Sequence, residues 1–241
     1  STTLINVGFL SIFRVYTLFA SSEILGFMNH VLILSGILSL LIASGYMLKA
    51  KHLKRMLAYS SLENMGLVAL AIGIGGSGYY AAFLLIILHS LAKSSLFYQM
   101  GQLSRVLHTF RLDDCGRYMA LYPAGALVLI AGMISIMAIP PSGLFISELM
   151  IFRALVNNNQ WIVLVIVILL LCFILYAMST RIMHIVYSNP RKEQVQETIS
   201  DVKPVETISQ FLFLGLVVIL CFYQPEFISG LINQSIDIFL P

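Results

Sequence analysis

The sequence has 241 residues, a length typical of one or two domains, but its composition excludes an ordinary soluble protein. Hydrophobic residues make up 59% of the chain, charged residues only 10%, and the mean hydropathy is +0.92. A soluble domain of this size cannot bury so much apolar surface, whereas a chain in lipid needs no polar exterior across the ~30 Å of hydrocarbon. The net charge of +3 gives no indication of nucleic-acid binding. We therefore predict a polytopic membrane protein.

Cofactor and metal motifs are not found in the sequence. Cys115, Cys172 and Cys221 follow no spacing typical of a metal site or a disulfide framework. No haem, iron–sulfur, flavin or nucleotide signature occurs either, so we expect neither a metal nor a cofactor in this chain. An apolar run begins almost directly after Ser1, without a basic leader or a cleavage site, and we interpret the chain as a piece of a longer one.

Apolar stretches follow one another along the chain, and most are long enough for a helix of about 20 residues to cross the hydrocarbon. They cover approximately residues 4–22, 27–48, 57–75, 79–101, 118–139, 142–156, 161–187 and 207–223. An open strand edge cannot satisfy its hydrogen bonds in lipid, and the alternating pattern of a membrane barrel is absent from the sequence. We therefore predict an all-α fold.

The 118–156 region permits two interpretations. Its middle contains Pro140, Pro141 and Gly143, and because proline lacks a backbone donor, residues 139–147 form either a turn between two spans or a break inside one. Length alone favours two spans.

The basic residues favour a single broken crossing. If 118–158 crosses once, ten basic residues of the polar loops share one side, which the positive-inside rule makes cytoplasmic. They are Lys49, Lys51, Lys54, Arg55, Arg105, Arg111, Arg117, Arg191, Lys192 and Lys203. We predict about seven crossings in the inner (cytoplasmic) cell membrane, beginning inside and ending outside.

Ionisable residues within the spans are candidate functional residues, because each costs about 2.5–3.5 kcal/mol at the centre of a helix. The candidates are Arg14, Glu63, His89, Lys93 and Glu148. His89 and Lys93 are four residues apart near the middle of the 79–101 span, so they share one face of a helix. Lys93 is either structural, held permanently by a carboxylate, or a proton carrier whose protonation a moving charge switches, with His89 as a relay.

The acidic candidates also have two interpretations each. On a broken crossing Glu148 lies deep, where a carboxylate can bind a proton near neutral pH, whereas between two spans it would cap a helix at the membrane surface. Glu63 is either a point of proton uptake from the cytoplasm, together with Lys54, or an ion-pair partner of Lys54 or Arg55. Arg14 is always charged, and we interpret it as structural.

Three motifs together resemble the proton-translocating antiporter-like subunits shared by respiratory complex I, Mrp-type sodium/proton antiporters and membrane-bound hydrogenases. They are LKRMLAYSS at 53–61 with Met65 and Gly66, HSLAK at 89–93 with Leu96 and Phe97, and PPSGLFISE at 140–148. Their order and spacing are similar to those of the family. Residues 61–66, 140–148 and 223–226 look most like the F-type subunit of hydrogenase-4 and formate hydrogenlyase.

The resemblance implies the C-terminal half of a fourteen-helix subunit built from inverted repeats. In order, this gives the last helix of a missing first repeat (1–22), a five-helix repeat with a broken helix (27–187), a cytoplasmic polar loop (188–206), and a final transmembrane helix with a tail (207–241). By position, Lys93 resembles the central lysine of the second half-channel, His89 its neighbouring histidine, and Glu148 the terminal ionisable residue on the broken helix. Asn6 stands where complex I members have a lysine or histidine that connects the half-channels.

We therefore predict a proton-translocating membrane subunit of a redox-driven complex of the NADH:quinone oxidoreductase or membrane-bound hydrogenase type. It would have no redox centre of its own and would work in the bilayer with other membrane subunits. Protons would pass from Glu63 or Lys54 to His89 and Lys93, and then to Glu148. The alternatives are a sodium/proton antiporter subunit of Mrp type that uses the same residues, and a non-pumping anchor or remnant, suggested by the missing first half and by Asn6.

Overall fold

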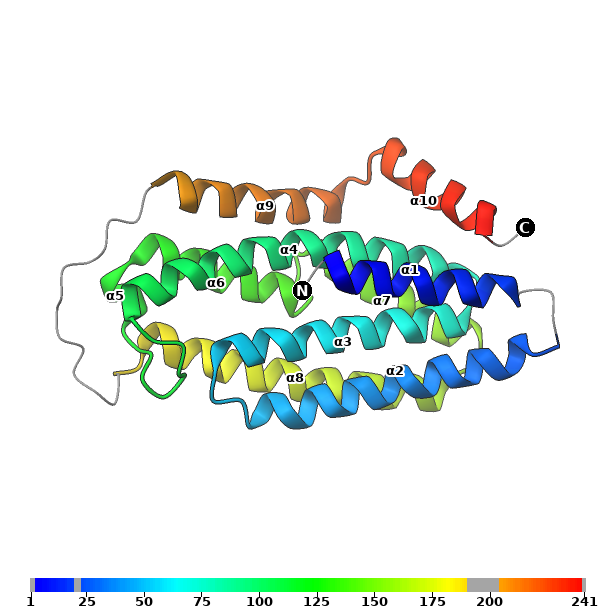
Figure 1. Cartoon of the computed structure of the whole chain (residues 1–241), viewed down its shortest axis with the longest axis horizontal. Coiled ribbons are helices and arrows are strands. Elements are labelled where there is room, and N and C mark those ends of the chain that lie inside the picture. Colours follow the sequence, from blue (N-terminus) through cyan, green and yellow to red (C-terminus); the bar gives the residue numbers. More distant parts are fainter. Residues whose placement is uncertain (1–2, 20–22, 190–203, 240–241) are drawn as a thin grey trace.

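The computed structural model describes residues 3–19, 23–189 and 204–239, and these residues form an elongated bundle of helices (Figure 1). The helices are α1 (Thr3–Leu18), α2 (Leu25–Leu48), α3 (Leu53–Ile74), α4 (Ser77–Leu107), α5 (Tyr118–Leu121), α6 (Pro123–Ile136), α7 (Gly143–Asn157), α8 (Trp161–Tyr187), α9 (Pro204–Phe222) and α10 (Glu226–Phe239). Five of them, α2, α3, α4, α8 and α9, are long and apolar enough to cross a membrane. The prediction of an all-α polytopic membrane protein is confirmed.

Helices α6 and α7 lie end to end along the bundle, with the proline segment between them (Figure 1). They have 14 and 15 residues, which at about 1.5 Å per residue is too short for either to cross alone. Ser142 joins the two: its hydroxyl donates to the Ser135 carbonyl at 2.9 Å and accepts from the Leu144 amide at 3.2 Å. This arrangement is that of one broken crossing, with Pro140 and Pro141 in the break and Gly143 beginning α7.

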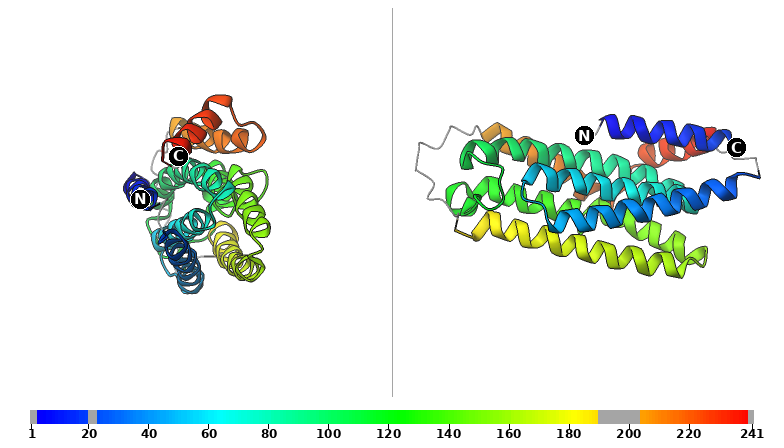
Figure 2. Two further views of the ribbon diagram at one scale, coloured as in Figure 1. Left: turned by 90° about the vertical axis from the view of Figure 1, so that its right-hand side faces the viewer. Right: turned by 60° about the horizontal axis from the view of Figure 1, so that its bottom comes forward.

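Helix α4 is the central helix of the bundle. It packs against α3, α6, α7 and α9, and the end-on view in Figure 2 shows it between α9 and the other helices. A polar side chain near the middle of α4 is therefore enclosed by protein on several sides and not by lipid.

The basic loops meet at one end of the bundle. The backbone amide of Leu53 donates to the Phe110 carbonyl at 3.0 Å, that of Leu112 to Lys51 at 2.9 Å, and that of Arg117 to Ser188 at 2.9 Å. These bonds join the segment before α3 and the end of α8 to the 108–117 loop. Seven of the ten basic residues, in these loops or in the adjoining turns of α3 and α4, thus share one end of the bundle. Arg191, Lys192 and Lys203 lie outside the described residues.

Helix α10 was not anticipated from the sequence. It is amphipathic, with polar residues such as Asn233, Gln234 and Asp237 among apolar ones, and it packs against α4. Its 14 residues are too few and too polar for a crossing, so hydropathy alone gave no signal for it.

Close packing of α2 on α3 depends on two facing glycines. A Cβ atom at Gly36 would lie 2.6 Å from the Gly66 carbonyl oxygen, and one at Gly66 would lie 3.0 Å from the Gly36 oxygen. Such small-residue contacts are typical of membrane helix pairs, because they let two backbones approach each other.

We expect Gly36→Ala to lower the free energy of unfolding by about 1–3 kcal/mol, because the added methyl group must push the two backbones apart. Gly45→Ala, on the same helix, is the matched control, because a Cβ atom there meets nothing within 4 Å. Thermal unfolding of the two variants in detergent measures the difference. Equal stability of the two variants would contradict the role of this contact.

Candidate functional site

Lys93 lies in the centre of the bundle with an exposed fraction of 0%. Its ammonium group donates to the Ser60 hydroxyl at 2.6 Å and to the main-chain carbonyl of Leu57, both on α3. The ion pairs found in the described part of the chain are Arg105–Glu206 and Arg111–Asp114. Neutral oxygens and not a carboxylate therefore hold Lys93, which disfavours the interpretation of a lysine fixed permanently by an ion pair.

The acceptor at Leu57 belongs to a cluster of α3 oxygens. The Leu57 carbonyl also accepts from the hydroxyls of Ser60 at 3.0 Å and Ser61 at 3.4 Å. One turn further, Asn64 donates to the Ser60 carbonyl at 2.9 Å, and its side-chain oxygen is buried without a partner. Positions 57, 60, 61 and 64 recur at the i, i+3, i+4, i+7 spacing, so they line the face of α3 next to Lys93.

Glu63 is also inside the bundle, with 2% of its surface exposed, and one of its carboxylate oxygens has no hydrogen-bond partner. Its charge interacts with that of Lys93. Lys54 and Arg55 are exposed at the basic end, where the Lys54 ammonium lies 3.9 Å from the centre of the Phe110 ring. The structure therefore does not bring Glu63 together with Lys54 or Arg55 as an ion pair.

Glu148 lies on α7, shortly after the break, and is 9% exposed. Its charge interacts with that of Glu63, and α3 packs against both α4 and α7. The ionisable side chains therefore form a series, His89 and Lys93 on α4, Glu63 on α3 and Glu148 on α7. Glu63 interacts electrostatically with both Lys93 and Glu148.

His89 is 0% exposed, and neither ring nitrogen has a hydrogen-bond partner. Next to it, Ser90 accepts from the Asn6 amide of α1 at 2.9 Å, while the Asn6 oxygen is buried and unpartnered. Buried polar atoms are almost always bonded to protein or to ordered water. The unpartnered atoms of Glu63, Asn64 and His89 are therefore the groups to which ordered water would bind along the series.

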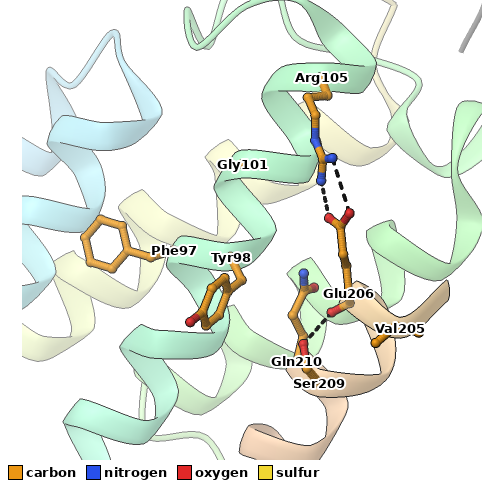
Figure 3. Close-up of a pocket in the computed structure, with 8 residues that line it drawn as sticks. All are labelled: Phe97, Tyr98, Gly101, Arg105, Val205, Glu206, Ser209 and Gln210. Carbon is orange, nitrogen blue, oxygen red and sulfur yellow. Dashed lines mark hydrogen bonds and ion pairs between the residues drawn. The ribbon is translucent and has the colours of Figure 1, made fainter. Parts of the chain in front are cut away.

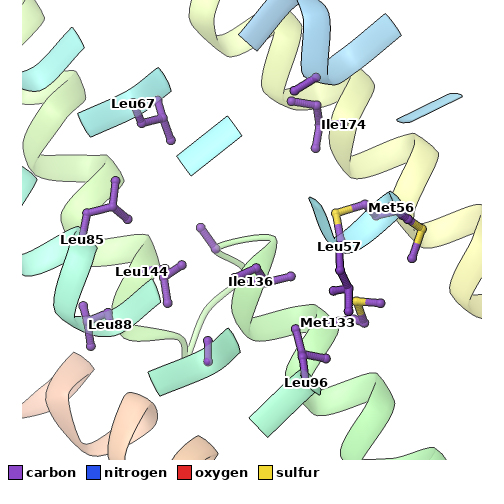
Figure 4. Close-up of a cluster of buried hydrophobic side chains, with 14 of the residues drawn as sticks. Met56, Leu57, Leu67, Leu85, Leu88, Leu96, Met133, Ile136, Leu144 and Ile174 are labelled. Atoms are coloured by element: carbon purple, nitrogen blue, oxygen red, sulfur yellow. The ribbon is translucent and has the colours of Figure 1, made fainter. Parts of the chain in front are cut away.

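Apolar side chains surround these polar groups. Leu57, Leu96 and Met133 come from α3, α4 and α6, and Figure 4 shows them among the buried hydrophobic residues of the core. Dense packing here, such as Leu96 against Gly132, separates the series from lipid and from bulk water. Charges in such an apolar setting interact much more strongly than they do in water.

The sequence analysis missed Ser60 and the Leu57 carbonyl. Both lie in the LKRMLAYSS motif, which carries part of the family resemblance, and a main-chain acceptor leaves no trace in the sequence. The signal available was the shared helix face of Ser60, Ser61 and Asn64. In the described ranges no cluster of three or more histidine, cysteine or acidic side chains could hold a metal ion.

Ser60→Ala is expected to slow proton transfer through the site without unfolding the protein. The change removes one hydrogen bond to a charged group, which is worth about 1.5–3 kcal/mol and corresponds to roughly 10-fold or more in occupancy of the observed Lys93 position. Proton-translocation rates of the intact complex measure the effect, with Ser44→Ala as the control, because Ser44 bonds only locally to Leu41. Unchanged rates for Ser60→Ala would show that this bond does not position Lys93.

Comparison with known proteins gives consistent results at the level of family and fold. A family model described as NADH:quinone oxidoreductase/Mrp antiporter, TM, matches residues 1–174. The chain is 32% identical over 155 residues to a hydrogenase-4 component F homolog from Methylacidiphilum infernorum, covering 64% of this chain and 33% of the relative. It is 28% identical over 216 residues to NAD(P)H-quinone oxidoreductase chain 4 2 from a Synechococcus strain, covering 85% of this chain and 40% of that one.

Two solved structures share the fold. A chain of the archaeal membrane-bound sulfane sulfur reductase superposes with a TM-score of 0.83 at 22% identity, covering 99% of this chain and 48% of that one. A chain of the Mrp complex from Dietzia superposes with a TM-score of 0.74 at 15% identity, covering 96% and 49%. The chain thus spans less than half the length of these relatives.

Proposed function

Because the chain belongs to the family of NADH:quinone oxidoreductase and Mrp antiporter membrane subunits, we propose that it forms part of a proton-translocating subunit in a redox-driven membrane complex. It would work beside other membrane subunits, in the cytoplasmic membrane, with the basic end of the bundle facing the cytoplasm. Within this subunit, protons pass through His89, Lys93, Glu63 and Glu148.

One observation carries the proposal: a buried lysine is held by neutral oxygens next to a carboxylate with which it forms no direct ion pair. Because no carboxylate is directly paired with it, a lysine in this position can lose its proton without leaving the charge of an ion-pair partner uncompensated. It can regain the proton when the nearby carboxylate is negative. Protonation of Lys93 can therefore be changed by moving charge in the apolar interior, which a structural ion pair would resist.

The electrostatic interactions support a revised order of transfer. Glu63, which the sequence alone left open as a surface uptake point, is buried and interacts with both Lys93 and Glu148. A positive charge that arrives near His89 repels the Lys93 ammonium, whose proton then moves to the Glu63 carboxylate through water. The negative charges of Glu63 and Glu148 repel each other, which favours a state in which the two carboxylates share one proton. The proton can therefore continue to Glu148 and then to the far side of the membrane.

Sodium transport is the second candidate, because the Lys93 ammonium is held by oxygen atoms that would also suit a monovalent cation. The acceptors are the Leu57 carbonyl and the Ser60 hydroxyl, and the unpartnered Asn64 oxygen lies on the same helix face. A sodium/proton antiporter of Mrp type would use this cluster and exchange one ion for the other.

Transport by the intact complex in proteoliposomes distinguishes these functions. We expect redox turnover in sodium-free buffer to move protons, detected by a pH-sensitive dye, and a protonophore to abolish the signal. Sodium-dependent transport that resists the protonophore would instead identify a sodium carrier. Normal turnover without transport of either ion would show that the subunit is only an anchor.

A further inference from the structure

Helix α9 lies along α4, and the two helices run in opposite directions. Polar contacts join them at three levels: Arg105–Glu206 at the basic end, Ser95–Gln210 further along, and Tyr80–Gln224 just beyond the end of α9. Figure 3 shows the first of these, the ion pair between Arg105 of α4 and Glu206 of α9. Helix α9 is therefore attached to the central helix of the bundle over most of its length.

The middle of this helix pair lies against the break in the crossing. Val217 is seven residues after Gln210 on α9, and Leu88 is seven residues before Ser95 on α4, so the two lie at about the same level. Gly143, the first residue of α7, contacts both. A Cβ atom at Gly143 would lie 2.7 Å from the Val217 carbonyl oxygen and 2.9 Å from the Leu88 Cδ2 atom. Gly143 is thus the point at which α4, α7 and α9 meet.

Only glycine fits at this point without a shift of the backbone. Real Cβ atoms essentially never come within 3.0 Å of another heavy atom. The Leu88 side chain can rotate, but the Val217 oxygen belongs to the main chain of a helix and cannot turn away. Small residues let membrane helices approach each other in this way. Any side chain at position 143 must therefore push the beginning of α7 away from α9.

Helix α9 also contacts the other half of the broken crossing. It packs against α6 as well as α7. At the beginning of α6, the Tyr122 hydroxyl and the Thr207 hydroxyl of α9 form a hydrogen bond of 2.7 Å. Both halves of the crossing therefore rest on the same helix.

These contacts matter because the break separates α7 from α6. In a continuous helix the backbone hydrogen bonds fix the rise and rotation of every turn, but the two prolines of the break interrupt them. The place of α7 then depends on the Ser142 cap and on its neighbours. Glu148 is five residues, or about 7.5 Å, beyond Gly143 on α7. Where α7 begins thus decides how far Glu148 lies from Glu63 on α3.

We propose that Gly143 is a positioning residue for proton transfer. It lets α7 rest directly on the α9 main chain at Val217, and this contact sets the distance between Glu148 and Glu63. A tightly packed interior transmits a small displacement, and a misplacement of about 1 Å can slow a reaction step about 100-fold. The role in transfer rests on the proposed function, whereas the effect of the contact on Glu148 does not and can be measured separately.

Gly143→Ala in the intact complex tests the role in transfer. Gly215→Ala is the matched control, because it makes the same change on α9 where a Cβ atom meets nothing within 4 Å. We expect translocation per redox turnover to be at least about tenfold slower in Gly143→Ala than in Gly215→Ala. Equal translocation by the two assembled variants would overturn the proposal.

Infrared difference spectra of the assembled complex between two pH values show whether Gly143 acts through Glu148. The carboxylic acid band of Glu148 is identified by its loss in Glu148→Gln. We expect this band to change frequency in Gly143→Ala and to stay in place in Gly215→Ala. Slow translocation with an unchanged band would overturn the positioning role. If Glu148→Gln translocates protons normally, the proposed function fails, whereas the band still reports on the position of Glu148.

A second substitution tests the steric cause. Leu88→Val shortens the side chain that faces Gly143 from α4, so in the double variant α7 can accommodate the added methyl group with a smaller displacement. We expect Gly143→Ala with Leu88→Val to translocate protons several-fold faster than Gly143→Ala alone, with the Glu148 band closer to its original frequency. No gain from Leu88→Val, or failure of both variants to assemble, would show that Gly143 serves folding only and would overturn the proposal.

Discussion

Lys93→Met in the intact subunit is expected to abolish proton translocation while the complex still assembles. Methionine keeps the apolar length of the side chain but cannot carry a proton. Removing a buried charge that lacks a direct ion pair should cost little stability, because burying an ammonium group is itself unfavourable. Translocation by inside-out vesicles, measured as dye quenching during redox turnover, should fall at least about tenfold, as for loss of a residue with a direct role in proton transfer.

Lys49→Met is the control for this prediction, because Lys49 is exposed at the basic end and the same change there removes no buried group. We expect it to translocate protons normally. Equal translocation by Lys93→Met and Lys49→Met would remove Lys93 from the path. Loss of the assembled complex in the Lys93 variant would instead support a structural lysine.

Glu63→Gln and Glu148→Gln should each block translocation, because glutamine has the shape of glutamic acid but cannot exchange a proton. The two variants differ in the residue at which proton transfer is blocked. With Glu63→Gln, Lys93 loses the carboxylate with which it interacts, so transfer to Glu148 should fail even though Glu148 is intact. Glu63→Asp should restore part of the rate, because it keeps a carboxylate in the same part of the bundle.

Glu226→Gln makes the same chemical change on an exposed residue at the beginning of α10, and it should have no effect. Translocation by the four variants, each normalised to redox turnover, tests the order of the series. Normal rates in Glu63→Gln with loss in Glu148→Gln would show that the proton reaches Glu148 by a route that avoids Glu63.

The broken crossing and the buried charges could be predicted from the sequence because each rests on a strong physical constraint. Two prolines cannot remain in a regular helix at Pro140 and Pro141, and the positive-inside rule selects among the few topologies that remain. An ionisable residue in the middle of a span is unfavourable enough to mark a candidate site by itself, as His89 and Lys93 did.

The contacts between these residues could not be predicted in the same way. Sequence gives the depth of Glu63 in its helix but not how α3 is rotated against α4 and α7, and that rotation decides whether Glu63 faces Lys93 or the basic surface. The main-chain carbonyl of Leu57 has no residue-specific signal at all.

The central claim is that Glu63 and Glu148 take up and release protons during turnover, and infrared difference spectroscopy of the intact complex tests it most directly. We expect redox turnover to change a carbonyl band of protonated carboxylic acid, to shift that band in heavy water, and to lose part of it in Glu63→Gln and part in Glu148→Gln. Full turnover and proton translocation with no change in any carboxylic acid band assignable to these two residues would contradict the account.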